Sequence, residues 1–184
     1  MPHLAIYTGS FDPITLGHLD VLDRSRSLFD EVILAIGINP HKPPRVSVAE
    51  RKRHAEVLVA RLLKDKPAGA KVRVEAYQGL TIDFARRVGA AAIIRGIRNV
   101  TDLASECQLA ITNRQVAGVE TVFIVTGENF AYVSSSLIKQ IAAFGGDLNR
   151  LHALVPAEVI AGLEEKRRDP RNPLGMLASE GQVD

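Results

Sequence analysis

Apolar residues along the chain follow two patterns that alternate. Short runs rich in Val and Ile show little polar alternation, whereas longer segments repeat their apolar residues with helical period. Continuous apolar runs of strand length are typical of parallel strands covered on both faces. The runs predict strands at 4–7, 32–36, 72–76, 92–94 and 121–125. The periodic segments predict helices at 17–29, 48–63, 82–88, 102–116, 137–144 and 156–166.

The alternation of strand and helix predicts an α/β fold with right-handed crossovers. We expect a single, doubly wound, five-stranded parallel sheet with helices on both faces, formed by residues 1–168. Residues 169–184 contain Pro, Gly and Ser without periodicity and are expected to form a loosely ordered tail. In doubly wound sheets ligands bind beyond the carboxyl ends of the strands. Polar residues that directly follow a strand are therefore the candidates for function.

Composition agrees with an ordinary globular domain. The chain has 184 residues, of which 46% are hydrophobic and 24% charged. A net charge of +2 is too small to indicate nucleic-acid binding, and the basic run at 166–168 is typical of a solvated helix end. We predict no nucleic-acid partner, because a basic stripe and stacking aromatic residues are both lacking.

The single cysteine, Cys107, cannot form an internal disulfide, which is consistent with a reducing compartment. It falls on an apolar helical stripe and is interpreted as a small core residue rather than a nucleophile. A charged and then apolar leader is not evident, and apolar segments are too short to cross a bilayer. We expect a cytoplasmic protein without a membrane partner.

The most informative motif lies between the first predicted strand and the first predicted helix. Gly9 and Ser10 stand where the strand ends, and Gly17 and His18 stand where the helix begins. Free backbone N–H groups, the positive end of the helix dipole and an imidazole then face one point, which favours a phosphate. The spacing matches neither the dinucleotide fingerprint nor a Walker loop. Asp12, before Pro13, is interpreted as turn chemistry rather than catalysis.

Three further groups of polar residues follow predicted strands. Lys42 lies in a proline-stiffened loop after the second strand, and Arg95 and Arg98 flank Gly96 after the fourth. Arginine forks suit phosphate oxygens. The serines at 134–136 open a helix, where they can cap it or bind an anion. The histidines lack the spacing of a metal site, so we predict no metal held by protein ligands alone.

The segment Thr15-Leu16-Gly17-His18 resembles the Thr/His-x-Gly-His element of the nucleotidylyltransferase superfamily. The longer match over 9–15 narrows the resemblance to the bacterial phosphopantetheine adenylyltransferase family, and it extends over residues 4–164. The resemblance implies a Rossmann-like nucleotidylyltransferase fold. It also implies transfer of the adenylyl group of ATP to 4′-phosphopantetheine, which yields dephospho-coenzyme A and pyrophosphate. Neither a covalent nucleophile nor a covalent intermediate is required.

The same resemblance assigns roles to individual residues. It implies catalytic roles for His18, Lys42 and Arg98. Contacts to ATP are implied for Ser10, Phe11, His18, Gly96, Ile97, Arg98, Glu106, Phe130, Ala131, Tyr132, Val133, Ser134, Ser135 and Ser136. Contacts to the acceptor are implied for Ser10, Lys42, Thr81 and Arg95. Magnesium is expected to accompany ATP, held by phosphates and water, and the family implies a homohexamer.

The chain departs from the family at one place. Where the family usually reads Asp-Phe-Glu-Tyr-Glu, this chain has Asp102-Leu103-Ala104-Ser105-Glu106. Both outer acids are kept, but two aromatics and the middle acid are absent, which affects pocket lining and subunit packing. Two alternatives stay open: a related nucleotidylyltransferase with another phosphate acceptor, and a nucleotide-binding regulator without catalysis.

Overall fold

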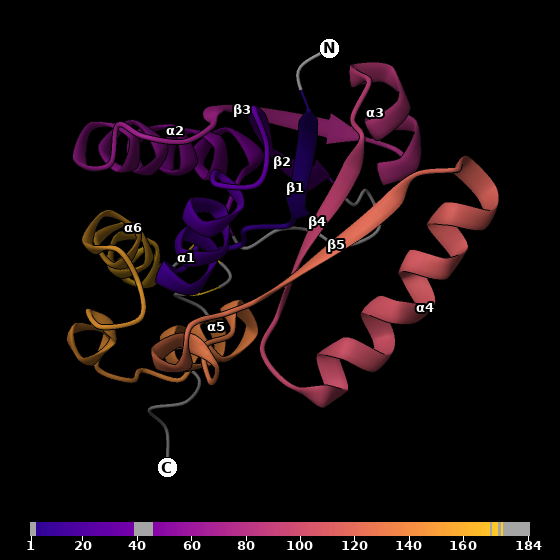
Figure 1. The fold of residues 1–184 in the computed structure, drawn as a ribbon. Coiled ribbons are helices and arrows are strands. Elements are labelled where there is room, and N and C mark those ends of the chain that lie inside the picture. The colour runs from indigo at the N-terminus through magenta and orange to yellow at the C-terminus, as the bar shows by residue number, and fades with distance from the viewer. Residues whose placement is uncertain (1–2, 39–45, 170, 173, 175–184) are drawn as a thin grey trace.

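The computed structural model describes residues 3–38, 46–169, 171, 172 and 174. Five parallel strands form one sheet in the order β3-β2-β1-β4-β5, and Figure 1 shows helices on both of its faces. The strands are β1 (Leu4–Gly9), β2 (Glu31–Ile38), β3 (Lys71–Gln78), β4 (Ala92–Ile97) and β5 (Glu120–Val125). The predicted doubly wound α/β fold is confirmed.

Six α-helices and two short 3₁₀ segments accompany the strands among the described residues. The helices are α1 (Leu16–Ser25), α2 (Val48–Asp65), α3 (Thr81–Val88), α4 (Val100–Ala117), α5 (Ser135–Ala143) and α6 (Ala157–Arg168). The 3₁₀ segments are η1 (Glu128–Phe130) and η2 (Leu148–Leu151). None of the helices within this part of the chain is long and apolar enough to span a membrane.

Alternate side chains of the central strand pack into two separate cores. Ala5 and Tyr7 of β1 join a core with α1, α2, α5 and α6, whereas Ile6 joins a core with α3. Figure 1 shows the corresponding layers, with α3 and α4 on the side of the sheet opposite α1, α2 and α6. The two-residue period of a strand explains this division. Burial on both faces also explains why the sequences of β1 and β2 are nearly continuous apolar runs.

The sheet order reverses at β1, which lies between β2 and β4. The chain builds outward to β3 and then crosses back to β4 on the other side of β1. Ligand sites of doubly wound sheets form where the carboxyl ends of such strands diverge. The register of β1 with β4 ends at Tyr7 and Ile94, so the candidate site lies just beyond this pair.

Several elements extend past their predicted ends. β4 continues to Ile97, so Arg95 and Gly96 lie within the strand, because β5 pairs with β4 as far as Ile97 and Val125 after β1 has turned away. α4 begins at Val100, before the predicted residue 102, because the Asn99 side chain accepts the Asp102 N–H at 2.9 Å.

The first helix is shorter than predicted and ends at Ser25 instead of Phe29. The cause is Arg26, which is 2% exposed. Its guanidinium donates to the carbonyls of Lys66 at 2.8 Å and Ala70 at 3.1 Å, in the connection from α2 to β3. A contact of this range cannot be read from local periodicity.

The cysteine interpretation was wrong in part. Cys107 is half-buried on α4 rather than in the core. All residues of α4 are described, and Asn113 alone among them is buried. The tail predicted at 169–184 lies largely outside the described residues, as does Lys42.

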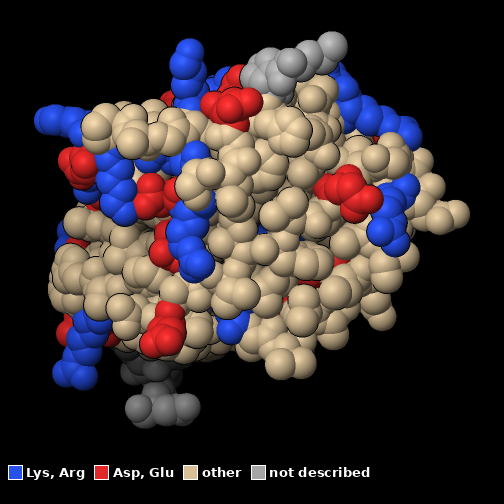
Figure 2. All heavy atoms as spheres, in the orientation of Figure 1, with Lys and Arg blue, Asp and Glu red and all other residues tan. Residues whose placement is uncertain are grey.

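Charged side chains are mixed on the face of the molecule drawn in Figure 2. Lys and Arg stand beside Asp and Glu there, and the middle of the same face is largely uncharged. Ion pairs among the described residues include those of Lys66 with Asp23 and of Arg61 with Glu158. The paired charges on this face differ from the continuous basic stripe that nucleic-acid binding favours.

Candidate active site

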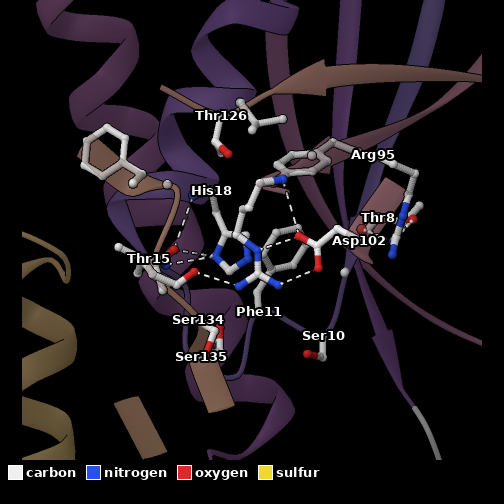
Figure 3. A pocket seen from close by; sticks show the side chains of 18 of the residues that line it. Thr8, Ser10, Phe11, Thr15, His18, Arg95, Asp102, Thr126, Ser134 and Ser135 are labelled. Carbon is white, nitrogen blue, oxygen red and sulfur yellow. Dashed lines mark hydrogen bonds and ion pairs between the residues drawn. The ribbon is translucent and has the colours of Figure 1, made fainter. Parts of the chain in front are cut away.

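A cavity of about 290 Å³ lies at the carboxyl ends of β1 and β4. Figure 3 shows side chains from different elements around it, among them His18, Asp102 and Ser10. Predicted site residues that line it are Ser10, Phe11, His18, Arg95, Gly96, Arg98, Glu106, Phe130, Val133, Ser134, Ser135 and Ser136. Predicted residues outside this lining are Ile97, Ala131 and Tyr132, of which Tyr132 is 64% exposed.

His18 is held by the first turn of α1. The Thr15 side chain accepts the His18 N–H at 3.3 Å, and the Thr15 N–H donates to Nδ1 of His18 at 3.0 Å. This is a reciprocal capping box in which histidine takes the place of the usual Glu or Gln. Because Nδ1 accepts a hydrogen bond, the ring hydrogen of the neutral imidazole resides on Nε2.

The environment of His18 keeps the imidazole neutral. Burial lowers its pKa to about 4, and the positive charges of Arg98 and Arg95 act in the same direction. The Phe11 ring meets the imidazole edge to face at 5.1 Å between centroids. His18 is therefore an oriented, uncharged hydrogen-bond donor at neutral pH.

Phe11 itself adopts an unusual backbone conformation. Its φ is +44°, in the left-handed region that a bulky L-residue rarely enters. Such a residue costs about 1–3 kcal/mol and persists only where its surroundings fix it. Its ring is 2% exposed and lies 5.4 Å from the Tyr7 ring, edge to face. This conformation places the aromatic ring under His18.

Arg95 is bound on two sides. Its Nε donates to Glu106 Oε2 at 2.7 Å, and its Nη2 donates to Glu106 Oε1. Its Nη1 donates to the Thr8 carbonyl at 2.8 Å. Nη1 also donates to the Thr8 hydroxyl at 3.3 Å. A guanidinium has five N–H donors, so these contacts leave one for a ligand. Glu106, which the resemblance assigned to ATP, has both carboxylate oxygens on Arg95.

Arg98 repeats the arrangement with Asp102, which lies one turn before Glu106 on α4. Its Nε and Nη2 donate to Asp102 at 2.8 and 3.1 Å, and its Nη1 donates to the Val133 carbonyl at 2.8 Å. The hydrogen bond from Arg98 is the main cause of the lowered pKa of Asp102, which burial opposes. Asp102 lines the cavity but was not predicted as a site residue. Its four-residue spacing from Glu106 on one helix was the available signal.

The start of α5 forms the opposite wall of the cavity. The Ser134 hydroxyl caps the helix by accepting the Leu137 N–H at 3.1 Å, and the Ser135 hydroxyl donates to the Pro13 carbonyl at 2.8 Å. The N–H groups of Ser135 and Ser136 belong to the first helical turn, where intrahelical acceptors are lacking. Capping and anion binding are therefore compatible at this segment, since one uses the hydroxyl and the other uses the backbone.

Gly17 allows close packing as well as ligand approach. A Cβ at this position would lie 3.2 Å from the Cβ of Phe130, which is closer than side chains normally tolerate. The contact brings η1 against α1. The Asp20 carboxylate adds a second link by accepting the Gly127 N–H at 2.8 Å.

A second cavity of about 530 Å³ opens beside the first, at the carboxyl ends of β2 and β3. It shares Thr8, Gly9, Ser10 and Arg95 with the first cavity. Thr81, predicted to contact the acceptor, lies in this second lining, 2.8 Å from the hydroxyl of Tyr77. Two ligands could thus meet at Ser10 and Arg95.

Metal-binding groups are sparse among the described residues. Within this part of the chain, groups of three or more His, Cys, Asp or Glu that could hold a metal ion do not occur. The two carboxylates at the cavity, Asp102 and Glu106, are already paired with arginines. The described side chains therefore do not fit a dedicated metal cage.

Comparison with known proteins agrees with this geometry. A family model described as cytidylyltransferase-like matches residues 6–141. The phosphopantetheine adenylyltransferase of Heliobacterium modesticaldum is 42% identical over 167 residues, covering 90% of this chain and 94% of that protein. The phosphopantetheine adenylyltransferase of Clostridium perfringens is 45% identical over 164 residues, covering 89% of this chain and 94% of that protein.

Solved structures with the same fold are much less similar in sequence. Plasmodium falciparum nicotinic acid mononucleotide adenylyltransferase, complexed with NaAD, has a TM-score of 0.62 at 16% identity, covering 90% of this chain and 96% of that chain. A bifunctional NMN adenylyltransferase/ADP ribose pyrophosphatase from Francisella tularensis has a TM-score of 0.65 at 16% identity, covering 99% and 53%. These two structures support the fold alone. On the evidence of the curated relatives and the family model, the chain belongs to the phosphopantetheine adenylyltransferase family, within the cytidylyltransferase-like proteins.

Proposed function

We propose that this enzyme transfers the adenylyl group of ATP to the phosphate of 4′-phosphopantetheine, forming dephospho-coenzyme A and pyrophosphate. The observation that carries the proposal is the pair of cavities that meet at Ser10 and Arg95. A transfer between two bound substrates needs this arrangement, because the reacting groups must be held within contact distance of each other.

The reaction is an in-line displacement. An oxygen of the acceptor phosphate attacks the α-phosphorus of ATP, and the bond from that phosphorus to the α–β bridging oxygen breaks. The electron pair of the broken bond leaves with pyrophosphate. A phosphate monoester is already anionic at neutral pH, so positioning and charge stabilisation can carry the catalysis.

On the ATP side, three groups act on the phosphates. The Nε2–H of His18 donates to an α-phosphate oxygen as charge accumulates there, with its orientation fixed beforehand by Thr15 and Phe11. The two spare N–H groups of Arg98 contact the triphosphate of the same ATP molecule. The first-turn N–H groups of α5 receive the β- and γ-phosphates.

On the acceptor side, the spare N–H group of Arg95 and the Ser10 hydroxyl hold the attacking phosphate. The pantetheine arm occupies the second cavity, beside Thr81 and Tyr77. Lys42 completes this set by family resemblance; it lies outside the described residues, and its role rests on the sequence.

A nucleotidyltransferase that uses ATP generally works with a divalent cation. We propose magnesium, bound to the triphosphate oxygens and to water and entering as part of the nucleotide substrate. The shortage of suitable ligands among the described residues supports this assignment over a resident metal.

We also propose that the chain assembles as the homohexamer implied by its family. In support, α4 leaves large apolar residues exposed, including Val100 at 82% and Ile111 at 59%. Light scattering after size exclusion should then give six times the mass of the chain. A monomer would contradict the assembly without affecting the reaction.

Pyrophosphate release tests the reaction directly. With ATP, we expect turnover of 4′-phosphopantetheine and a product with the mass of dephospho-coenzyme A. Unphosphorylated pantetheine is the matched control and should give none. If nicotinate mononucleotide or glycerol 3-phosphate were turned over faster than 4′-phosphopantetheine, the proposed acceptor would be wrong. Tight ATP binding without turnover of any acceptor would instead favour a regulator.

A further inference from the structure

Asp12 is a buried carboxylate that belongs to neither cavity lining. It is 6% exposed and lies in the turn between β1 and α1. Its two oxygens have partners on different elements. Oδ1 accepts the backbone N–H of Val46 at 3.1 Å, and Oδ2 accepts from Nζ of Lys139 at 3.0 Å. One side chain therefore joins three segments that are far apart in sequence.

Each of these segments carries part of the proposed active site. The turn leads into His18. Lys139 lies in the second turn of α5, whose first residues face the cavity. Val46 follows, four positions later in sequence, the lysine at 42. The Asp12 carboxylate thus connects the turn that leads into α1 with α5, the two helices whose first turns are proposed to bind phosphate.

Two other side chains also hold the same turn. The Ser135 hydroxyl donates to the Pro13 carbonyl, so α5 and the turn are linked a second time. The Arg51 guanidinium, 4% exposed, donates through Nη1 to the Ser10 carbonyl. These bonds surround the left-handed residue Phe11, a conformation that requires such support.

We propose that Asp12 and Lys139 form a positioning pair that sets the spacing between His18 and the start of α5. The inference rests on the proposed function, because these are the two places that hold the triphosphate in that scheme. Neither residue of the pair touches substrate. The pair acts by fixing the turn against α5, so its loss should weaken ATP binding and misplace the imidazole while leaving the acceptor cavity intact.

The ion pair is well suited to this task. The side chains of Asp12 and Lys139 are 8% and 21% exposed, so water screens the pair poorly. Removing Lys139 takes its ammonium away from the buried Asp12 carboxylate, and a buried charge that loses its ion-pair partner destabilises the fold. The chain offers a matched control in Glu50 and Lys166, a pair with 15% and 18% exposure that joins α2 to α6. Neither Glu50 nor Lys166 lines a described cavity.

The test compares Lys139→Met with Lys166→Met in the full-length protein. We expect Lys139→Met to raise the KM for ATP and lower kcat, each by about tenfold, the scale of one coupled pair. The KM for 4′-phosphopantetheine should change less than twofold. Lys166→Met should lower the melting temperature to a similar degree with kinetics near those of the wild type. Lys139→Arg, which keeps the charge, should recover most of the activity.

Two further measurements make the outcome decisive. The double variant Asp12→Asn/Lys139→Met should be no worse than Lys139→Met alone, since both changes break one interaction. Direct titration with ATP should show the same tenfold weakening without any acceptor.

If wild type binds ATP but turns over no acceptor, the proposed function fails, and the ATP dissociation constants still test the pair. ATP binding within twofold of wild type in Lys139→Met would overturn the inference, as would equal kinetic losses in Lys166→Met.

Discussion

Single residues at this site are set by their neighbours before any ligand arrives. The imidazole of His18 has its free hydrogen on Nε2 because the Thr15 N–H occupies Nδ1. Arg98 donates three hydrogen bonds to the protein and keeps two N–H groups, whereas Arg95 donates four and keeps one. Groups oriented in this way need little reorganisation when charge moves onto the phosphates.

The first prediction concerns the protonation of His18. Its pKa of about 4 in the folded protein lies below the value of 6.5 expected for the unfolded chain. Between these values the unfolded chain binds a proton that the folded site excludes, so the free energy of unfolding should decrease as pH falls from 6.5 to 4. The His18 ring signals in NMR should stay constant from pH 6 to 8. A titration midpoint near 6.5 in the folded protein would contradict a neutral donor.

The second prediction concerns the contribution of His18 to the rate. Replacement by Ala removes one oriented donor and should lower kcat by about a hundredfold or more. The exposed His152, which directly follows η2 and lines neither cavity, provides the control, and its replacement by Ala should leave kcat unchanged. Steady-state kinetics with saturating substrates measures both. Near-normal turnover of His18→Ala would remove the imidazole from the mechanism.

The third prediction separates the two acids of α4. Asp102→Asn weakens the support of Arg98 and should raise the KM for ATP, whereas Glu106→Gln weakens the support of Arg95 and should raise the KM for the acceptor. Changes of about tenfold are expected for a partly buried, bidentate pair. If Glu106→Gln affects ATP alone, Glu106 contacts the nucleotide, as the family resemblance implies, and does not act through Arg95.

At the scale of elements, helix starts and strand ends create the site. α1 and α5 both begin at the cavity, and each is capped by a hydroxyl side chain, Thr15 and Ser134. The caps satisfy some N–H groups and leave others for an anion. β4 contributes Arg95 because it continues past the end of its pairing with β1 and is paired there with β5.

The fourth prediction compares two serines of α5. Ser134→Ala removes the helix cap and should lower the free energy of unfolding by about 1 kcal/mol. Ser136 lies two positions further along and its side chain is exposed, so Ser136→Ala should leave stability nearly unchanged. Urea denaturation of the two variants gives the comparison. Equal stabilities would mean that the Ser134 hydroxyl does not cap the helix in solution.

At the scale of the whole molecule, the order of the strands brings two cavities to one arginine. β1 is the shared wall, with β4 and β5 on the side of the cavity proposed for ATP and β2 and β3 on the side of the cavity proposed for the acceptor. A single reversal of strand order is therefore enough to place two substrates against each other.

The fifth prediction uses this division. A Cβ at Gly37 of β2 would lie 3.2 Å from the Tyr77 hydroxyl, so Gly37→Val should crowd the second cavity. We expect the KM for 4′-phosphopantetheine to rise about tenfold, on the scale of an overpacked contact. The KM for ATP, measured in the same variant, is the internal control. An equal rise in both would show that the cavities are not independent.

Local sequence was sufficient for the fold class and the elements, and it also predicted a candidate anion site. Strand and helix periods depend on neighbouring residues, and the Gly9–His18 segment carries its strand end and helix start within itself. The predicted fold is confirmed. The roles given to the site residues stay predictions, although the structure brings most of the described ones to one cavity.

Tertiary structure alone decided how the charged groups are used. The pairing of Arg98 with Asp102, the partners of Asp12 and the neutral state of His18 depend on burial and on contacts between distant segments. Sequence spacing specifies which side chains are available along each element. Which of them meet depends on strand order and on the exclusion of water, and these arise only when the whole sheet and its helices have packed.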